Sequence, residues 1–307
     1  MNSVQPYRFK TITEYHRQAG LPKPEHPLIS LVHMDDVSFP ITDGSFSLIF
    51  DFYSISMKRV YNARFKYGQQ ASDFDEGVLF FMAPGQVFGV EIEKGVTRHR
   101  PEGWMILIHP DFLWNTPLAK TIRQYEFFGY SVYEALYLSD KEETMLTSIA
   151  KNIEQEYHAN IDRFSQNVII AQLELLLTYA ERFYQRQFIT RKIANHEILT
   201  RLEDLLSDYF NSGTLAKQGL PSVSYIASTL NISPGYLSGL LKSLTGRNTQ
   251  QHLHDKLIGL AKEKLSTTNL SVSEIAYELG FEHLQSFSKL FKTKTNLSPL
   301  EFRHSFH

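Results

Sequence analysis

Short apolar runs separated by Gly, Pro, Asp and Asn fill the first third of the chain, which is the pattern of β-strands joined by turns. Four such runs are Pro27–His33, Ser45–Met57, Gly77–Met82 and Gly103–Pro110. In the second run, every other residue from Phe46 to Phe52 is Phe or Leu, so one face of this strand points toward a core. The irregular spacing of the runs predicts a small sandwich or barrel.

From about residue 139 the apolar period changes to that of helices. Ser139 and Glu142 form a capping box, which predicts that a helix begins there. A second helix is expected over about Asp162–Gln187, and the short link between the two makes them antiparallel neighbours. A third is expected near Asn195–Tyr209, ending at the Asn-Ser-Gly that follows.

The second of these helices carries an apolar stripe with two interpretations. The stripe consists of Ile169, Leu173, Leu176, Ala180 and Phe183, with Phe164 and Val168 beside it. Packing against the rest of the N-terminal part and the formation of a dimer interface explain this pattern equally well.

An internal repeat marks the C-terminal part. Residues 223–232 read Val-Ser-Tyr-Ile-Ala-Ser-Thr-Leu-Asn-Ile, and residues 272–281 read Val-Ser-Glu-Ile-Ala-Tyr-Glu-Leu-Gly-Phe. After a one-residue insertion the match resumes, with Leu237–Lys242 corresponding to Phe287–Lys292. Each copy predicts a helix, a tight turn and a second helix, which is the arrangement of a helix-turn-helix motif.

Local signals support this interpretation of both copies. Ala227 and Ala276 are small enough for two helices to cross closely, while Gly280 and Asn231 suit a left-handed turn position. Helix starts are predicted at Ser233-Pro234, at Ser271 with Glu274, and at Ser298 with Glu301. Between the copies, Gln251–Ser266 reads as one helix of about 24 Å, long enough to hold two recognition helices in successive major grooves.

These residues closely resemble the DNA-binding domain of AraC/XylS-type bacterial transcription regulators. The resemblance covers about 195–307 and is carried by Ser273–Phe281, Phe287–Lys292 and Leu297–Arg303. It implies two recognition helices in neighbouring major grooves, with base contacts from exposed positions early in each helix. A helical bundle that binds protein is the alternative, because helix-turn-helix geometry also occurs as plain packing.

The polar and basic positions of the two copies, together with the resemblance, give a set of expected DNA-contacting residues. The second copy supplies Gln285, Ser286, Ser288, Lys289 and Lys292, the first copy Tyr236, Ser238 and Lys242, and the remaining positions are Lys256 and Arg303. Gly235 and Gly239 stand where the family often has a large or basic residue, so we expect weak direct readout by the first helix. Leu257 also replaces a common basic residue of the linker helix.

Charge and composition agree with a DNA partner for the C-terminal part. Residues 1–180 carry 16 Lys and Arg against 22 Asp and Glu, whereas residues 181–307 carry 15 against 11. A basic C-terminal part favours a polyanion, and an acidic N-terminal part does not. The chain has no Cys, which excludes disulfides and thiol chemistry, and shows neither a secretory signal nor a bilayer-spanning run.

The N-terminal part has a weaker resemblance to the cupin-like sensors of this family. By analogy the barrel would bind a small effector, such as a sugar or another metabolite, through Asp51, Tyr53, Arg64 and Trp104. A metal-dependent cupin enzyme is the competing class. The barrel histidines His33, His99 and His109 lack the spacing of cupin metal ligands, so we expect no cofactor, no metal and no catalytic residue.

The sequence therefore predicts an α+β protein of two domains. Residues 1–190 would hold a cupin-like β-barrel (about 20–120) and helices for dimerisation (about 121–190), and residues 191–307 an all-α DNA-binding domain. Its helix-turn-helix motifs would span about 223–242 and 272–292. The expected protein is a cytoplasmic, homodimeric regulator, with activation through RNA polymerase as one mode, and an empty barrel used only for dimerisation is the alternative.

Overall fold

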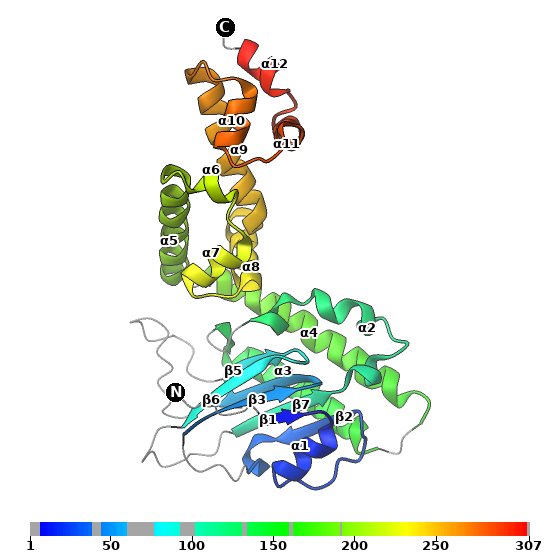
Figure 1. Ribbon diagram of the computed structural model, residues 1–307. Coiled ribbons are helices and arrows are strands. Elements are labelled where there is room, and N and C mark those ends of the chain that lie inside the picture. Colours follow the sequence, from blue (N-terminus) through cyan, green and yellow to red (C-terminus); the bar gives the residue numbers. More distant parts are fainter. Residues whose placement is uncertain are drawn as a thin grey trace. The chain divides into compact units, whose positions relative to one another are not determined.

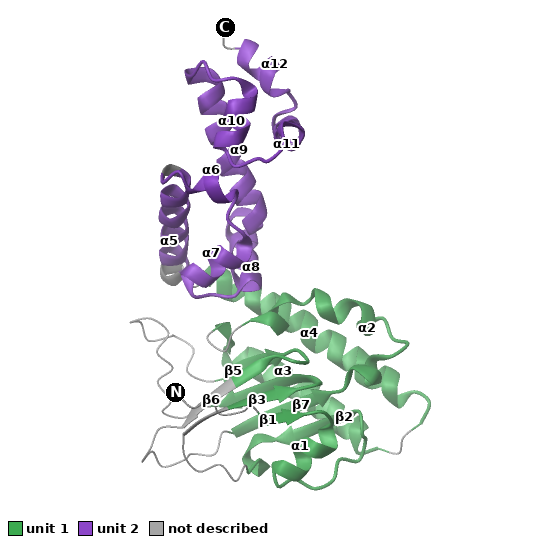
Figure 2. Cartoon of the chain, in the orientation of Figure 1, with its two compact units in different colours: residues 1–190 green, residues 191–307 purple. Residues whose placement is uncertain are grey.

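The computed structural model describes residues 7–38, 44–59, 77–92, 102–130, 134–159, 162–190 and 192–305. Figure 1 shows a β-rich N-terminal part and a helical C-terminal part. The chain divides into two compact units, residues 1–190 and residues 191–307 (Figure 2). Among the described residues, no helix is long and apolar enough to cross a membrane.

Two sheets form the N-terminal unit. The larger has the order β2-β7-β4-β5-β8, with antiparallel neighbours, and its strands are β2 Ile29–His33, β7 Glu102–Ile108, β4 Tyr53–Arg59, β5 Gly77–Met82 and β8 Leu136–Leu138. The smaller has the order β1-β3-β6, with strands β1 Tyr7–Phe9, β3 Gly44–Phe50 and β6 Val87–Ile92. The β-rich character predicted for this part is confirmed.

One hydrophobic cluster joins the two sheets. It includes Phe9 and Phe50 from the smaller sheet, Val32 and Leu107 from the larger, and residues of the short helix α1 (Ile12–Gln18). Because side chains alternate along a strand, the neighbours of Val32 point to the opposite face of the larger sheet. The inner face of the larger sheet thus contributes to the core, and its outer face is available to helices.

The prediction of a single strand over Ser45–Met57 is wrong. The chain turns at Asp51, so that β3 and β4 belong to different sheets. The Asp51 amide donates to the Phe9 carbonyl, and the Asp51 carboxylate pairs with Arg8 at 2.9 Å, which holds this corner. Phe52 is still buried and stacks on Phe50, so an uninterrupted apolar alternation concealed the break.

Helices complete the N-terminal unit. The short α2 (Leu118–Thr121) precedes α3 (Asp140–Tyr157), which begins with the predicted capping box, and α4 (Ser165–Thr190) follows. α3 contacts β2 and β8, α4 contacts β8, and the two helices contact each other. The apolar stripe of α4 is buried within this unit, namely Ile169, Leu173, Leu176, Ala180 and Phe183. The structure therefore supports packing, and not a dimer interface, as the role of these five residues.

The C-terminal unit consists of helices. They are α5 Lys192–Asn211, α6 Thr214–Gln218, α7 Val223–Leu230, α8 Pro234–Thr245, α9 Thr249–Thr267, α10 Val272–Glu278, α11 Leu284–Thr295 and α12 Pro299–His304. Two hydrophobic clusters divide it into a first lobe around α7 and α8 and a second lobe around α10, α11 and α12. α9 supplies Leu253 to the first cluster and Leu257 to the second, so this helix connects the lobes.

Candidate nucleic-acid interface

Both copies of the repeat form the same turn. Asn231 and Gly280 adopt left-handed conformations with φ of 58° and 77°. In the first copy the Ile232 amide donates to the Ala227 carbonyl at 3.0 Å, and in the second the Phe281 amide donates to Ala276 at 2.9 Å. These equivalent hydrogen bonds end each first helix and set the direction of the recognition helix that follows.

The second recognition helix, α11, has an apolar side and a polar side. Phe287 and Phe291 are fully buried and anchor it in the second cluster. On the other side Gln285, Ser286, Lys289 and Lys292 are exposed, while Ser288 is half-buried. Amide and ammonium groups at these positions are the donors and acceptors that base edges and phosphates require.

The first recognition helix, α8, offers fewer side chains. Leu237, Leu240 and Leu241 are buried, and Lys242 is exposed. The Ser238 hydroxyl already has a partner, since it lies 3.1 Å from the Thr249 hydroxyl at the start of α9. This placement agrees with weak direct readout by α8.

Two of the sequence-predicted contacts are corrected by their surroundings. Tyr236 is 3 % exposed, so its ring is packed inside the protein and does not lie on a surface open to DNA. Arg303 is half-buried, and its guanidinium donates to the carbonyls of Leu265 at 3.3 Å and Leu270 at 2.6 Å. Those carbonyls belong to the end of α9 and the loop after it, so Arg303 ties α12 to this corner.

The linker helix places its residues as a core element. Leu257 is fully buried, which explains why an apolar residue stands where a basic residue is common in the family. Lys256 beside it is exposed and remains available for a phosphate. On the same helix, His252 lies 2.7 Å from the Thr245 hydroxyl.

Asp255 is a residue that the sequence interpretation missed. Its carboxylate accepts from Arg247 at 2.7 Å, in the loop after α8, and from Lys294 at 2.9 Å, near the end of α11. Partial burial raises the pKa of Asp255, but the hydrogen bond from Lys294 and the charges of Lys294, Arg247 and His252 outweigh it, so the pKa is lowered. One side chain on α9 thereby holds both lobes.

Of the four residues predicted to bind an effector, the three that the structure describes have different surroundings. Asp51 is paired with Arg8 at the strand corner, and Tyr53 is buried with its ring centroid 5.1 Å from that of Phe128. Arg64 lies outside the described residues. Trp104 does line a cavity, which lies between the outer face of the larger sheet and α3.

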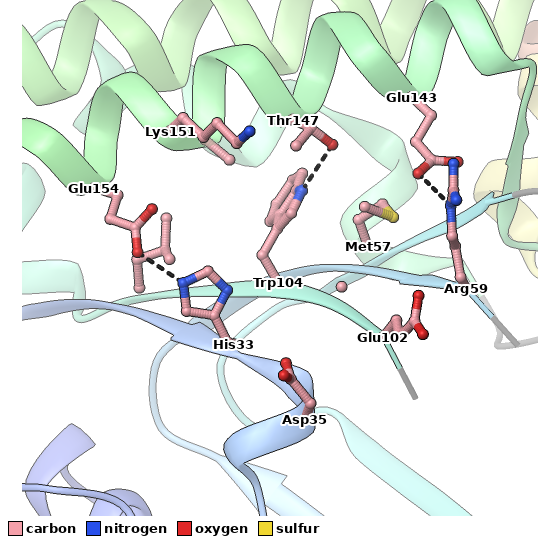
Figure 3. A pocket seen from close by; sticks show the side chains of 13 residues that line it. His33, Asp35, Met57, Arg59, Glu102, Trp104, Glu143, Thr147, Lys151 and Glu154 are labelled. Carbon is pink, nitrogen blue, oxygen red and sulfur yellow. Dashed lines mark hydrogen bonds and ion pairs between the residues drawn. The ribbon is translucent and has the colours of Figure 1, made fainter. Parts of the chain in front are cut away.

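This cavity is a groove of about 400 Å³ (Figure 3). The larger sheet supplies Leu31, His33, Asp35, Met57, Arg59, Glu102, Gly103 and Trp104, counting Asp35 just after β2, and α3 supplies Glu143, Thr147, Ala150, Lys151 and Glu154. Side chains bridge its walls at three places. His33 lies 2.8 Å from Glu154, the Trp104 indole donates to Thr147 at 3.2 Å, and Arg59 donates to Glu143 at 2.6 Å.

The comparisons with known proteins concern the C-terminal unit above all. A family model described as a helix-turn-helix domain matches residues 226–305. The HTH-type transcriptional regulator YfiF of Bacillus subtilis (strain 168) is 24 % identical over 243 residues, which are 77 % of this chain and 71 % of that protein. The arabinose operon regulatory protein of Escherichia coli (strain K12) is 33 % identical over 81 residues, 26 % of this chain and 28 % of its own length.

Several solved structures match about a third of the chain. The C-terminal domain of the two-component response regulator yesN from Fusobacterium nucleatum subsp. nucleatum is 31 % identical, with a TM-score of 0.29, and covers 33 % of this chain and 96 % of that domain. Taken together, the repeat, its two equivalent turns and the matched sequences show that the chain belongs to the AraC-type helix-turn-helix transcription regulators, which are DNA-binding proteins.

Proposed function

We propose that this regulator reads promoter DNA mainly through α11 and positions itself through α8. The observation that carries the proposal is the contrast between the two helices. Gln285 and Lys289 are exposed on α11, whereas the corresponding part of α8 presents glycine and a serine that is already hydrogen-bonded. Glutamine can bond bidentately to adenine, and lysine reaches guanine or phosphate.

The N-terminal unit is proposed to be a cupin-like sensor that responds to a small-molecule effector. An effector that binds the regulator in one arrangement better than in another would shift the population toward that arrangement and change DNA occupancy. Contact with RNA polymerase, and hence activation, is part of the same proposal. The comparisons name transcription regulators, which supports this role over that of an enzyme.

A homodimer is proposed to form through the outer face of α4. Phe164, Val168 and Leu175 are 53 %, 41 % and 43 % exposed. Their spacing places them on one side of the helix, opposite the buried stripe. We expect Val168→Glu to lower the mass measured by light scattering from that of a dimer to that of a monomer. Asn152→Glu, at an exposed position of α3, is the control.

The DNA proposal is tested by selecting bound sequences from random duplexes with the full chain over a salt series. The expected result is a motif with one strong and one weak half, and an affinity that falls steeply with salt. Lys289→Ala and Gln285→Ala should each weaken specific binding by about 1–3 kcal/mol and relax base preference, while Ser238→Ala should do much less. Greater damage from Ser238→Ala would reverse the ranking of the two helices.

If the chain binds no DNA at low salt, the proposal that it recognises DNA is contradicted, and a protein-binding adaptor is favoured.

An empty N-terminal unit is a separate alternative. It predicts that no metabolite raises the melting temperature, because a ligand that prefers the native state must raise it.

A further inference from the structure

The groove beside Trp104 lies on the outer face of the larger sheet, outside the core between the sheets. Leu31 and His33 line it, while Val32 between them belongs to the core cluster. The same alternation on β4 places Met57 and Arg59 in the groove. A ligand held here would touch both the sheet and α3, without entering the core between the sheets.

The groove has an excess of negative charge. Its carboxylates are those of Asp35, Glu102, Glu143 and Glu154, and its cations are those of Arg59 and Lys151. Without counting the histidine, the acidic groups outnumber the basic ones by two. A site with this balance favours a positively charged molecule over an anion.

Glu143 gives a second, independent indication. The residue is 6 % exposed, and while its Oε1 accepts from Arg59, its Oε2 is buried without a hydrogen-bond partner. A buried carboxylate oxygen without a partner is costly, and a charged donor is the partner that compensates it best. Gly77 packs closely against this oxygen, because a Cβ at that position would lie only 2.7 Å from it.

Most of the charged groups lie toward the two ends of the groove. Figure 3 shows Glu143, Glu102 and Arg59 at one end, Glu154 and His33 at the other, and Asp35 and Lys151 nearer the middle. On α3, Glu143 and Glu154 are eleven residues apart, which corresponds to about 16 Å along the helix axis. Between the ends lie the Trp104 ring and the apolar side chain of Met57.

We propose that this groove binds a linear organic polycation, an amine with ammonium groups toward both ends and methylenes between them. One ammonium group would donate to Glu143, another would lie by Glu154, and the methylene chain would cover Trp104 and Met57. This inference deepens the proposed function, since it assigns the chemical class of the effector, but the binding step stands whether or not the chain reads DNA.

The test measures binding by calorimetry to the full chain without DNA, because polyamines also bind nucleic acid. The probes are spermidine, hexylamine with a single ammonium group, and triethylene glycol with none. We expect spermidine to bind more tightly than hexylamine and triethylene glycol to give no heat of binding. Binding of triethylene glycol as tight as that of spermidine, or no binding of spermidine, would overturn the proposal.

Variants locate the site. Glu143→Gln should weaken spermidine about tenfold or more, the ratio expected for loss of a hydrogen bond to a charged group. Because Glu143 is buried and could support folding, Glu154→Gln is the second variant; it is more exposed and should weaken spermidine severalfold. Glu156→Gln, on the same helix but not in the groove, is the matched control. Equal affinities for all three variants and the unmodified chain would place the amine elsewhere and refute the assignment.

If spermidine binds at this site and the chain also binds DNA, adding spermidine should change the salt-corrected DNA affinity of the unmodified chain but not that of Glu143→Gln. Failure of this last step alone would contradict the effector role while the binding site stands. Failure of DNA binding alone would contradict the proposed function and leave the groove assignment intact.

Discussion

Two glycines near helix ends in the C-terminal unit have the same backbone conformation but different surroundings, so substituting each by alanine separates the two effects. Gly246, after α8, and Gly280, in the second turn, have nearly equal positive φ values of 74° and 77°. A Cβ at Gly246 would meet nothing within 4 Å. A Cβ at Gly280 would lie 2.5 Å from the Leu215 carbonyl oxygen and 2.8 Å from the Gly219 Cα. Both contacts are with backbone, which cannot move aside as a side chain can.

The magnitudes follow from these surroundings. Alanine in a left-handed conformation costs roughly 1–2 kcal/mol, and this is the whole cost expected for Gly246→Ala. Gly280→Ala has the same cost and adds the displacement of packed backbone, about 1–3 kcal/mol. We therefore expect about 2–5 kcal/mol for Gly280→Ala, with the difference between the variants caused by the close approach of the second turn to the α6–α7 segment.

Hydrogen exchange measured by mass spectrometry on the full chain is the appropriate assay, because it reports the C-terminal unit separately. The slowest amides of α9 and α10 should exchange about tenfold faster for every 1.4 kcal/mol lost. Amides of the N-terminal unit should be unchanged in both variants and serve as the internal control. Equal acceleration by Gly246→Ala and Gly280→Ala would refute the close approach between the backbone segments.

Three further changes test single side chains. Asp255→Asn should lower the free energy of unfolding by about 0.5–1 kcal/mol, since both ion pairs of Asp255 are partly exposed. The lowered pKa of Asp255 contributes stability that is present above the ordinary pKa of an aspartate and is lost as the pH falls through the lowered pKa. The urea midpoint of the variant should therefore change less with acid than that of the unmodified chain. Burial lowers the pKa of Lys58 from 10.5 to about 8, so the N-terminal unit should become more stable as the pH rises from about 8 to 10.5. Lys58→Met should abolish this gain in stability. A gain that persists in the variant would show that another group causes it. Arg303→Met should cost about 1–3 kcal/mol of stability and leave the DNA affinity of the folded protein unchanged; a reduced salt slope would restore the predicted phosphate contact.

The C-terminal unit could be predicted because its signals are local. A serine cap with a glutamate three residues later begins α10 at Ser271 and α12 at Ser298, and both capping boxes are formed. Gly280 and Asn231 occupy the left-handed positions that their small or polar side chains tolerate. Each of these features depends on a few neighbouring residues, which the sequence displays directly.

What could not be predicted depends on contacts between distant segments. Arg303 looks like a phosphate ligand in sequence, yet its partners are carbonyls 38 and 33 residues away. Tyr236 lies early in a recognition helix, and only the packing of the lobe shows that its ring is buried. Sequence position identifies the helix on which a side chain lies, but burial decides whether that side chain can reach a ligand.

The groove shows the same limit for the N-terminal unit. Trp104 was a candidate because it is an aromatic residue on an expected strand, and it does line the cavity. Glu143 carried no such signal, because it follows a capping glutamate and resembles any acidic residue in a first helical turn. The pairing of β2, β7 and β4 and the packing of α3 on these strands bring Trp104 and Glu143 into the same groove. The register of this pairing depends on residues that are far apart in the sequence.

Within the C-terminal unit, the length of α9 sets the distance between the two recognition helices. Their relative rotation depends on which residues of α9 face each lobe. The 19 residues of α9 span about 28 Å, close to the spacing of successive major grooves. Leu253 packs in the first cluster and Leu257 in the second, and Asp255 lies between them and binds a cation from each lobe. Since each residue turns the helix by about 100°, inserting or deleting one residue between Leu253 and Leu257 would rotate one recognition helix relative to the other. We therefore expect the half-site spacing that this regulator accepts to depend on the packing of α9 and on the two ion pairs of Asp255, and not on the residues proposed to touch the bases.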